Sequence, residues 1–317
     1  MTSNAPHLDP SRKHDAILLF DVTDGNPNGD PDNDGAPRTD LETSQGLVTD
    51  VALKRKIRDM VPLIAPDEAG YDIYVESGTA LESQHRRAYT ALNLALPKAK
   101  NGGEKDEADT ANSESAARTA GKQKKANESS VRDWMITSFY DVRMFGAVMA
   151  SQIAPAGKNR GPVQLGFARS IDPILPTQHT ITRVTQTRQS DTDRGENTEM
   201  GSKWTVPYGL YRTTLNFSAP LAQRTNVTSR DLEVLWRAIE VMFEHDRAST
   251  RGLMSLRGAY IFTHDDALGR APVHELAKLV TVERIETAKT PRVFEDYTVT
   301  VHEDKLPTGT TLTRLIG

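Results

Sequence analysis

The chain changes character twice between residues 20 and 60, whose sequence is FDVTDGNPNGDPDNDGAPRTDLETSQGLVTDVALKRKIRDM. The apolar run DAILLFDV (15–22) has the length of a buried strand. The loop after it is rich in Asp, Asn, Gly and Pro, which turns favour. A helix is then expected to begin after Thr49, its N-cap, and to end at Pro62. The segment therefore predicts a strand, a tightly turned acidic loop and a helix.

This predicted helix has one apolar face and a cationic flank. The apolar positions follow helical spacing: Leu53, Ile57, Met60 and Val61. Lys54 and Arg58 are one turn apart beside this face, and Arg55 is next to them. One side of the helix is thus expected in the core, with a positively charged edge beside it.

The rest of the chain predicts an alternation of strands and helices. Helices are expected at 80–95, 131–150 (ending near Arg143) and 228–249, and strands at 161–170, 180–188, 203–212, 213–219, 256–265, 278–286 and 296–301. The strands around 180–212 predict a projecting hairpin over 178–206, and residues 97–130 form a polar, low-complexity insertion that we expect to be mobile. Without the insertions the order is βαββαβ, which is typical of a ferredoxin-like or RNA-recognition-like α+β core.

Composition limits the class of protein. The 317 residues are 37% hydrophobic and include no cysteine, which excludes disulfides and thiolate chemistry. No secretory signal and no apolar run of membrane-spanning length are present, so a cytoplasmic protein without membrane contact is expected. The net charge of −4 is unevenly distributed: residues 1–48 hold nine acids and three bases, whereas residues 143–194 hold seven bases and three acids. Local cationic patches are therefore possible.

The acidic loop has two possible metal functions and one structural interpretation. The frames that begin at Asp24 and at Asp30 each match the start of a calcium-binding loop, but Gly35 and Leu41 stand where the bidentate Glu is required. The carboxylates that could instead hold magnesium for phosphodiester cleavage are Asp21, Asp24, Asp30 and Asp32. The structural interpretation is a turned connector, and we predict no metal site.

A second basic element strengthens a nucleic-acid interpretation. The segment APAGKNRGPVQ (154–164) places Lys158 and Arg160 among glycines, where backbone N–H groups can approach phosphate oxygens. Together with the cationic edge of the first helix, it predicts a track for a single-stranded phosphate backbone.

Several long strings carry a family resemblance. They are residues 21–59, YDVRMFGAVMA (140–150), RGPVQLGFARSIDPILPTQHTITR (160–183), MGSKWTVPYGLYR (200–212), MFEHDRASTRG (242–252) and EDYTVTV (295–301). They resemble the Cas-seven or Csd-two family of the RAMP superfamily, which supplies the backbone subunit of type I-C CRISPR Cascade. Residues 97–130 are longer and more polar than is expected of that family.

The resemblance implies a fold and a function. The fold would be one unit (1–317) with an RNA-recognition-like palm, an inserted finger region and a thumb hairpin at 178–206. Copies would stack head to tail along one CRISPR RNA (crRNA), beside subunits of the Cas-five and Cas-eight types, and the guide would pair with target DNA. No cofactor and no catalysis are implied. The alternative is a metal-dependent ribonuclease that uses Asp24, Asp30 or Asp32, because related type III subunits cleave RNA with a loop aspartate.

The resemblance also implies residue roles. The RNA-binding residues would be Arg38, Lys54, Arg55, Arg58, Arg143, Lys158, Asn159, Arg160, Gln164 and Arg169. The thumb would carry Arg183, Met200 and Trp204, of which an apolar or aromatic side chain can wedge between bases.

Overall fold

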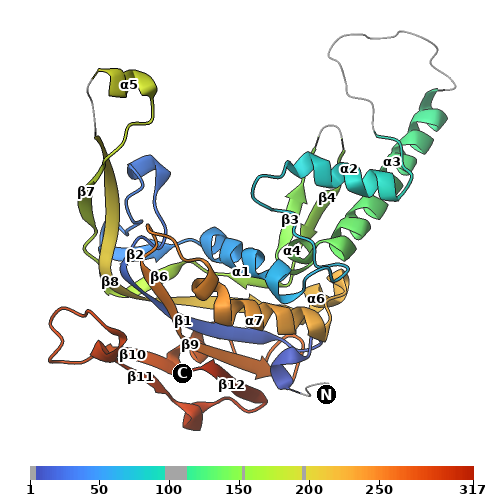
Figure 1. Cartoon of the computed structure of the whole chain (residues 1–317). Coiled ribbons are helices and arrows are strands. Elements are labelled where there is room, and N and C mark those ends of the chain that lie inside the picture. The colour runs from blue at the N-terminus through green and yellow to red at the C-terminus, as the bar shows by residue number, and fades with distance from the viewer. Residues whose placement is uncertain (1–4, 97–112, 152–153, 195–197) are drawn as a thin grey trace.

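The computed structural model describes residues 5–96, 113–151, 154–194 and 198–317. These residues form a mixed α/β fold around a large antiparallel sheet (Figure 1). The strands of this sheet are β1 (His14–Gly25), β2 (Gln45–Val48), β5 (Val163–Leu165), β6 (Ala168–Pro173), β7 (Thr177–Arg183), β8 (Glu199–Phe217), β9 (Leu253–His264) and β12 (Thr310–Ile316). Their order is β12-β9-β1-β8-β6-β2, and β5 and β7 both pair with β8.

Two small ladders and a set of helices complete the described fold. The ladders join β3 (Gly146–Met149) to β4 (Gly157–Arg160), and β10 (Val280–Arg284) to β11 (Tyr297–Val301). The helices are α1 (Asp50–Ile64), α2 (Leu81–Ala91), α3 (Ser113–Ser138), α4 (Tyr140–Met144), α5 (Gln189–Asp193), α6 (Ala219–Thr225), α7 (Ser229–His245) and α8 (Val273–Lys278). Short 3-10 turns lie at Pro6–Leu8, Pro31–Asn33, Phe294–Asp296 and Glu303–Lys305.

Strand β1 is the centre of the core, paired with β8 on one side and with β9 on the other. Its side chains alternate between two hydrophobic clusters. Leu18 and Phe20 pack on the face covered by α1 and α7, whereas Ile17 and Leu19 face the cluster beneath β10 and β11. Burial on both faces explains why the sequence of β1 is apolar without interruption.

Helices α1 and α7 form as their caps and periodicity predict. The Thr49 hydroxyl accepts the Ala52 N–H, and Thr228 and Asp231 form a reciprocal capping box. The predicted end of α1 at Pro62 is wrong, because the helix continues to Ile64. Proline lies in the last turn here, so its missing N–H costs α1 a single hydrogen bond close to an end that frays.

Other predicted boundaries also differ. The expected strand at 161–170 is divided between β5 and β6, because Gly166 and Phe167 interrupt the pairing, and residues 161 and 162 belong to neither strand. The two strands expected at 203–212 and 213–219 are one continuous strand, β8. Helix α3 begins at Ser113 instead of 131 and ends at Ser138, before the short helix α4. The first part of the polar insertion, 97–112, lies outside the described residues.

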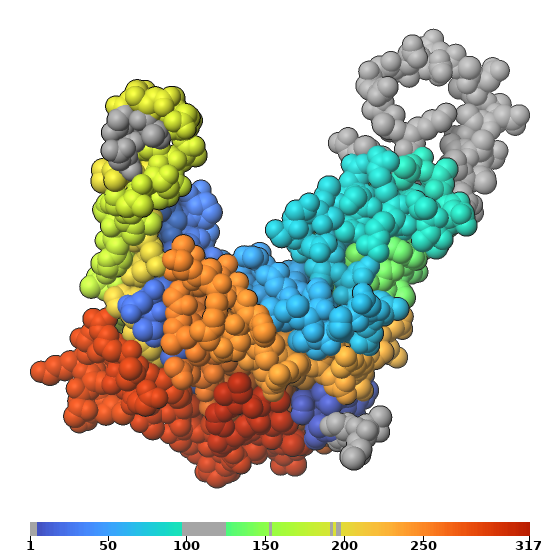
Figure 2. All heavy atoms as spheres, viewed as in Figure 1, coloured from blue at the N-terminus to red at the C-terminus, as the bar shows by residue number. Residues whose placement is uncertain are grey.

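Two projections rise from the same side of the sheet (Figure 1). One is the hairpin of β7 and β8, which pair from Thr177↔Thr205 to Arg183↔Glu199. The other is a helical lobe made of α2, α3, α4, β3 and β4, which has its own cluster of buried apolar side chains. Figure 2 shows a deep hollow between the hairpin and the helical lobe, with α1 at its floor.

Candidate nucleic-acid interface

The floor of the hollow is the exposed stripe of α1. Its residues are spaced by four: Val51, Arg55, Asp59 and Leu63, all exposed. The Arg55 side chain lies 3.5 Å from Asp59, one turn away, in an exposed pair. Such a pair contributes little to stability, so the guanidinium can exchange Asp59 for a phosphate at small cost.

The Phe145 ring contacts two cations on the flank of α1 that faces the helical lobe. The Lys54 ammonium lies 5.9 Å and the Arg58 guanidinium 5.2 Å from the centre of its ring. Lys54 also pairs with Asp50 at 3.0 Å. The sequence analysis did not select Phe145, because a buried aromatic residue after a short helix looks the same in sequence whether it fills a core or supports a site.

Arg58 joins α1 to the helical lobe. Its Nε donates to the Asp141 carboxylate at 2.7 Å, and that carboxylate also accepts the backbone N–H groups of Tyr74 and Val75. Only 12% of the Arg58 side chain is exposed. The guanidinium is therefore engaged mainly in the fold, although α1 carries it where the sequence predicts.

Strand β4 brings two further cations to this flank. Gly146, which follows Phe145, pairs with Arg160, and Val148 pairs with Lys158. Because side chains alternate along a strand, Lys158 and Arg160 share one face of the ladder. Both are exposed, and neither forms an ion pair within the described part of the chain. Asn159 points the other way, and its amide donates to the Val142 carbonyl at 2.8 Å.

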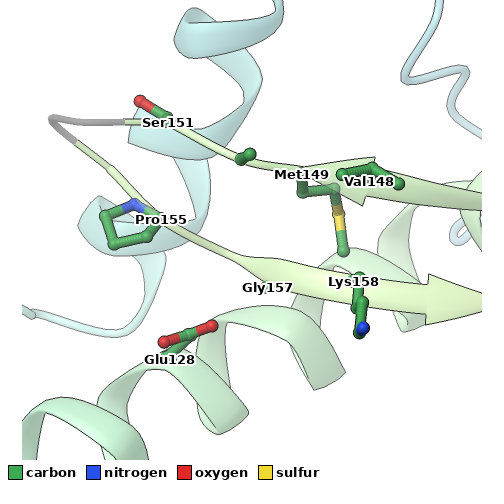
Figure 3. Close-up of a pocket in the computed structure, with 8 residues that line it drawn as sticks. Glu128, Val148, Met149, Ser151, Pro155, Gly157 and Lys158 are labelled. Carbon is green, nitrogen blue, oxygen red and sulfur yellow. The ribbon is translucent and has the colours of Figure 1, made fainter.

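A pocket of about 550 Å³ lies between the β3–β4 ladder and α3. Figure 3 shows Lys158 on β4 and Glu128 on α3 beside it, with Val148, Met149 and Pro155 supplying apolar surface. Lys158 is thus a basic group next to an apolar depression, an environment different from that of Arg55 on the open floor.

Arg38 and Arg169 both flank strand β2, which comes directly before α1 in the chain. Leu47 connects them, since its N–H donates to the Arg38 carbonyl and it pairs with Arg169 in the β2–β6 ladder. Arg38 lies 3.2 Å from Asp30, and Arg169 lies 2.7 Å from Asp40. The hydrogen bond from Arg169, followed by backbone N–H donors, lowers the pKa of Asp40 to about 2.

Arg143, expected to bind RNA, is buried in the fold. It is 6% exposed and donates to Asp231 at 2.7 Å and to the carbonyls of Gly70 and Ile136. The structure thus gives Arg143 a position inside the fold, because a residue whose donors are engaged there does not present them in the hollow, and its contact with RNA stays a prediction. Gln164 is likewise engaged locally, since its amide donates to the Gly161 carbonyl at 3.2 Å.

The hairpin carries the three residues expected on a thumb. Arg183 pairs with Glu199 across the ladder. Met200 is 76% exposed, and Ile181 and Val184 are exposed as well. Trp204 lies near the base, half-buried, with an indole N–H that has no partner among the described residues. An exposed methionine among other apolar groups is the surface that wedging between bases would need.

The acidic loop folds largely upon itself. Asp30 accepts the Asp32 N–H and pairs with Arg38, and the Asn26 amide donates to the Gly35 carbonyl. Among the described residues, no group of three or more His, Asp or Glu side chains is arranged to hold a metal ion. Neither the calcium frame nor the magnesium set therefore assembles in the described part of the chain.

Asp21, one of the proposed magnesium ligands, has a structural position instead. It is 1% exposed, lies 2.9 Å from Arg257 and accepts the Tyr208 hydroxyl at 3.1 Å. Burial raises the pKa of Asp21 despite the nearby Arg257.

In the described part of the chain, no helix is long and apolar enough to span a membrane.

The chain is thus a mixed α/β protein that gathers cations around a hollow, and comparison places it in a family. The family described as CRISPR-associated protein Cas7 matches residues 12–302. The chain therefore belongs to the Cas7 family. A CRISPR-associated protein Cas7 from Haloferax volcanii is 25% identical over 249 residues, which are 72% of this chain and 64% of that relative. The match thus spans less than two thirds of that relative's length.

Two solved structures are similar at low identity. A chain of "CRISPR RNA-guided surveillance complex, pre-nicking" gives a TM-score of 0.48 at 14% identity, covering 79% of this chain and 78% of the other. A chain of "CRISPR RNA-guided surveillance complex" gives 0.42 at 12% identity, covering 79% and 68%.

Proposed function

We propose that this chain is a non-catalytic crRNA-binding subunit that forms the backbone of a type I-C Cascade complex. Copies stack head to tail along one CRISPR RNA, with the RNA in the hollow, and present the guide for pairing with target DNA. Subunits of the Cas-five and Cas-eight types complete the particle. Membership of the Cas7 family supports the class of function. The cations around the floor of the hollow support its location.

The strand order supports a ferredoxin-like palm. If β1, β6, β8 and β9 are numbered 1 to 4 in chain order, their order across the sheet is 4-1-3-2, and each strand is antiparallel to its neighbours. This is the strand order of a ferredoxin-like sheet. Helices α1 and α7 then occupy the two helix positions of a βαββαβ unit. In this proposal the β7–β8 hairpin within 178–206 is the thumb, and the helical lobe is the finger region.

The distribution of charge suits binding that does not depend on base sequence. Arg55, Lys158 and Arg160 are exposed side chains that can reach phosphates, and phosphate contacts carry no direct sequence information. Base pairing between guide and target supplies the sequence specificity in such complexes. A net charge of −4 leaves most of the surface free of strong positive charge, which eases contact between copies.

Binding is favoured over cleavage by the state of the loop carboxylates. Asp30 is paired with Arg38, and Asp21 is buried against Arg257. Hydrolysis assisted by metal ions requires carboxylates that converge on a cation and the scissile phosphate. Here two of the four candidate carboxylates are neutralised by arginines of the same chain.

The observation that carries the proposal is the set of exposed cations on α1, at the floor of the hollow, and on β4 of the helical lobe, and replacing these cations tests the proposal. In the variant Arg55→Gln/Lys158→Gln/Arg160→Gln, we expect weaker binding of short single-stranded RNA for every base sequence. The slope of log K against log salt should fall by about 0.7 for each lost phosphate contact. Fluorescence anisotropy at several salt concentrations measures both quantities.

The matched control is Lys278→Gln/Lys289→Gln/Lys305→Gln, which removes the same charge from exposed positions of the C-terminal region, on the other face of the sheet. This control should bind as the wild type does. Equal losses in the two triple variants, or a loss that depends on the base sequence, would contradict the assigned location.

A further inference from the structure

We propose that the loop between α7 and β9, residues 246–252, is a second phosphate-binding element of the hollow, and that Lys56 is the residue that positions it. This inference rests on the proposed function, since it adds a contact surface for the same RNA. We call residues 246–252 the α7–β9 loop.

Buried charges anchor the loop from below. Lys56 is 2% exposed, and its ammonium contacts the Asp246 carboxylate at the start of the loop. Arg251, near the other end of the loop, donates to the same carboxylate at 2.8 Å. A buried ion pair gains little net stability after desolvation. Burial lowers the pKa of Lys56 against the opposing effect of Asp246. The buried pair therefore adds little to the stability of the fold, and its main effect is to fix the position of the α7–β9 loop relative to α1.

Close backbone contact holds the loop against the end of β1. The Asn26 N–H donates to the Thr250 carbonyl at 2.8 Å. A Cβ atom on Gly25 would lie 1.8 Å from the Arg251 carbonyl oxygen, and one on Gly252, whose φ is 63°, would lie 2.4 Å from the Thr23 oxygen. The two glycines therefore allow the loop and β1 to approach more closely than side chains would permit.

The outer surface of the loop is polar and exposed. Arg247, Ser249 and Thr250 are all exposed. Arg247 pairs with Glu244 across one turn at 2.5 Å, and both side chains are more than half exposed. A surface pair of this kind contributes little to stability. The guanidinium and the two hydroxyls are therefore donors that phosphate oxygens can recruit.

The loop lies beside the predicted RNA track. Lys56 directly follows Arg55 on α1, and its ammonium contacts Asp246 at the start of the loop, which places the loop next to the exposed stripe of α1. In Figure 2 the orange surface of this region stands between α1 and the hairpin, at the edge of the hollow. A strand that crosses Arg55 toward the hairpin would pass the α7–β9 loop.

The test compares two arginines of similar setting. Arg247→Gln removes a loop guanidinium, and Arg237→Gln removes one from the middle of α7, where Arg237 pairs with Glu240 at the same i,i+3 spacing. We expect Arg247→Gln to weaken single-stranded RNA binding about threefold or more and to lower the salt slope by about 0.7, while Arg237→Gln changes neither.

Lys56→Met tests positioning. If Lys56 acts by holding the loop, Lys56→Met should reproduce the loss of affinity and of salt slope seen in Arg247→Gln, and the double variant should be no worse than either single one. A purely structural Lys56 would lower the melting temperature without changing the salt slope of the folded protein. Should Lys56→Met fail to fold, Arg247→Gln with Ser249→Ala carries the test.

Different results would overturn the proposed RNA-binding function and the proposed role of the α7–β9 loop. If the wild-type chain binds no RNA, the proposed function is wrong. If the wild type binds RNA and Arg55→Gln weakens binding, but Arg247→Gln and Arg237→Gln behave alike, the loop inference alone is overturned.

Discussion

Arg143 and Arg55 illustrate how two arginines near the hollow differ in their surroundings. Arg143 donates to a buried carboxylate and to backbone carbonyls, and its guanidinium stands 5.5 Å from the Tyr71 ring and 5.7 Å from the Tyr140 ring. Arg55 has one exposed partner. Helical periodicity can place Arg55 on an outer face. However, Asp231 is 88 residues from Arg143 in sequence, so no local pattern reveals their pairing.

The stability of the two variants should differ accordingly. Arg143→Met leaves Asp231 buried without its cation, which should lower the free energy of unfolding by about 3–5 kcal/mol. Arg55→Gln should change it by less than about 0.5 kcal/mol. Denaturant titration measures both values, and a similar small change in the two variants would refute the structural role given to Arg143.

At the scale of elements, the β1–β9 pair contains a buried histidine that links stability to pH. His14 Nε2 lies 2.9 Å from the Asp9 carbonyl, which only accepts, so Nε2 carries a proton and Nδ1 accepts the Thr263 hydroxyl at 3.1 Å. Burial lowers the pKa of His14 to about 4, and His7 and His264 add to this effect, while the hydrogen bond to Asp9 opposes it.

The sign of the pH effect follows from the protons bound. Between the folded pKa of about 4 and the ordinary value of 6.5, the unfolded chain binds a proton that the folded chain does not. His14 should therefore reduce stability as pH falls from 6.5 to 4, by about 3 kcal/mol at most, and its effect should level off below pH 4. His14→Gln should remove this part of the slope in unfolding experiments across that range. Parallel slopes in the two proteins would exclude His14 as the cause.

The elements that sequence predicts well are those with strong local signals. An apolar run gives β1, and helical spacing with a cap gives α1 and α7. Short elements such as β2 and α6 lack room for a periodic pattern and were missed. The early start of α3 has another reason: residues 113–130 include four Ala, three Lys and two Glu, which favour helix, and they extend a helix that buries Val131 and Met135.

The cations of the candidate site that sequence could predict are those placed by local helix or strand periodicity. Helical spacing puts Lys54, Arg55 and Arg58 together, and strand alternation puts Lys158 beside Arg160. The contact of α1 with Phe145, and that of Lys56 with Asp246, joins segments far apart in the chain. Such contacts depend on tertiary packing, so sequence patterns gave the list of cations but not their partners.

At the scale of the whole molecule, the hollow is open and its walls come from different parts of the chain (Figure 2). If copies line up along one RNA, longer single-stranded RNA should recruit more copies. Mass photometry should then show steps of one chain, 35.0 kDa, as the RNA is lengthened. The triple variant Arg55→Gln/Lys158→Gln/Arg160→Gln should show fewer steps. A single bound copy at every RNA length would contradict the head-to-tail proposal.

The uninterrupted course of β8 has a mechanical consequence. This strand has 19 residues and is about 60 Å long when extended. It pairs with β7 over residues 199–205 and with β1 over residues 206–217. The longer part of the strand, residues 206–217, is therefore held in the core of the molecule, and the shorter part, residues 199–205, projects as one side of the hairpin. Tilting the hairpin would shear β8 against β1 and break ladder hydrogen bonds. In a filament of stacked copies, the rigid backbone of β8 in each copy would therefore fix where that copy's hairpin stands along the RNA.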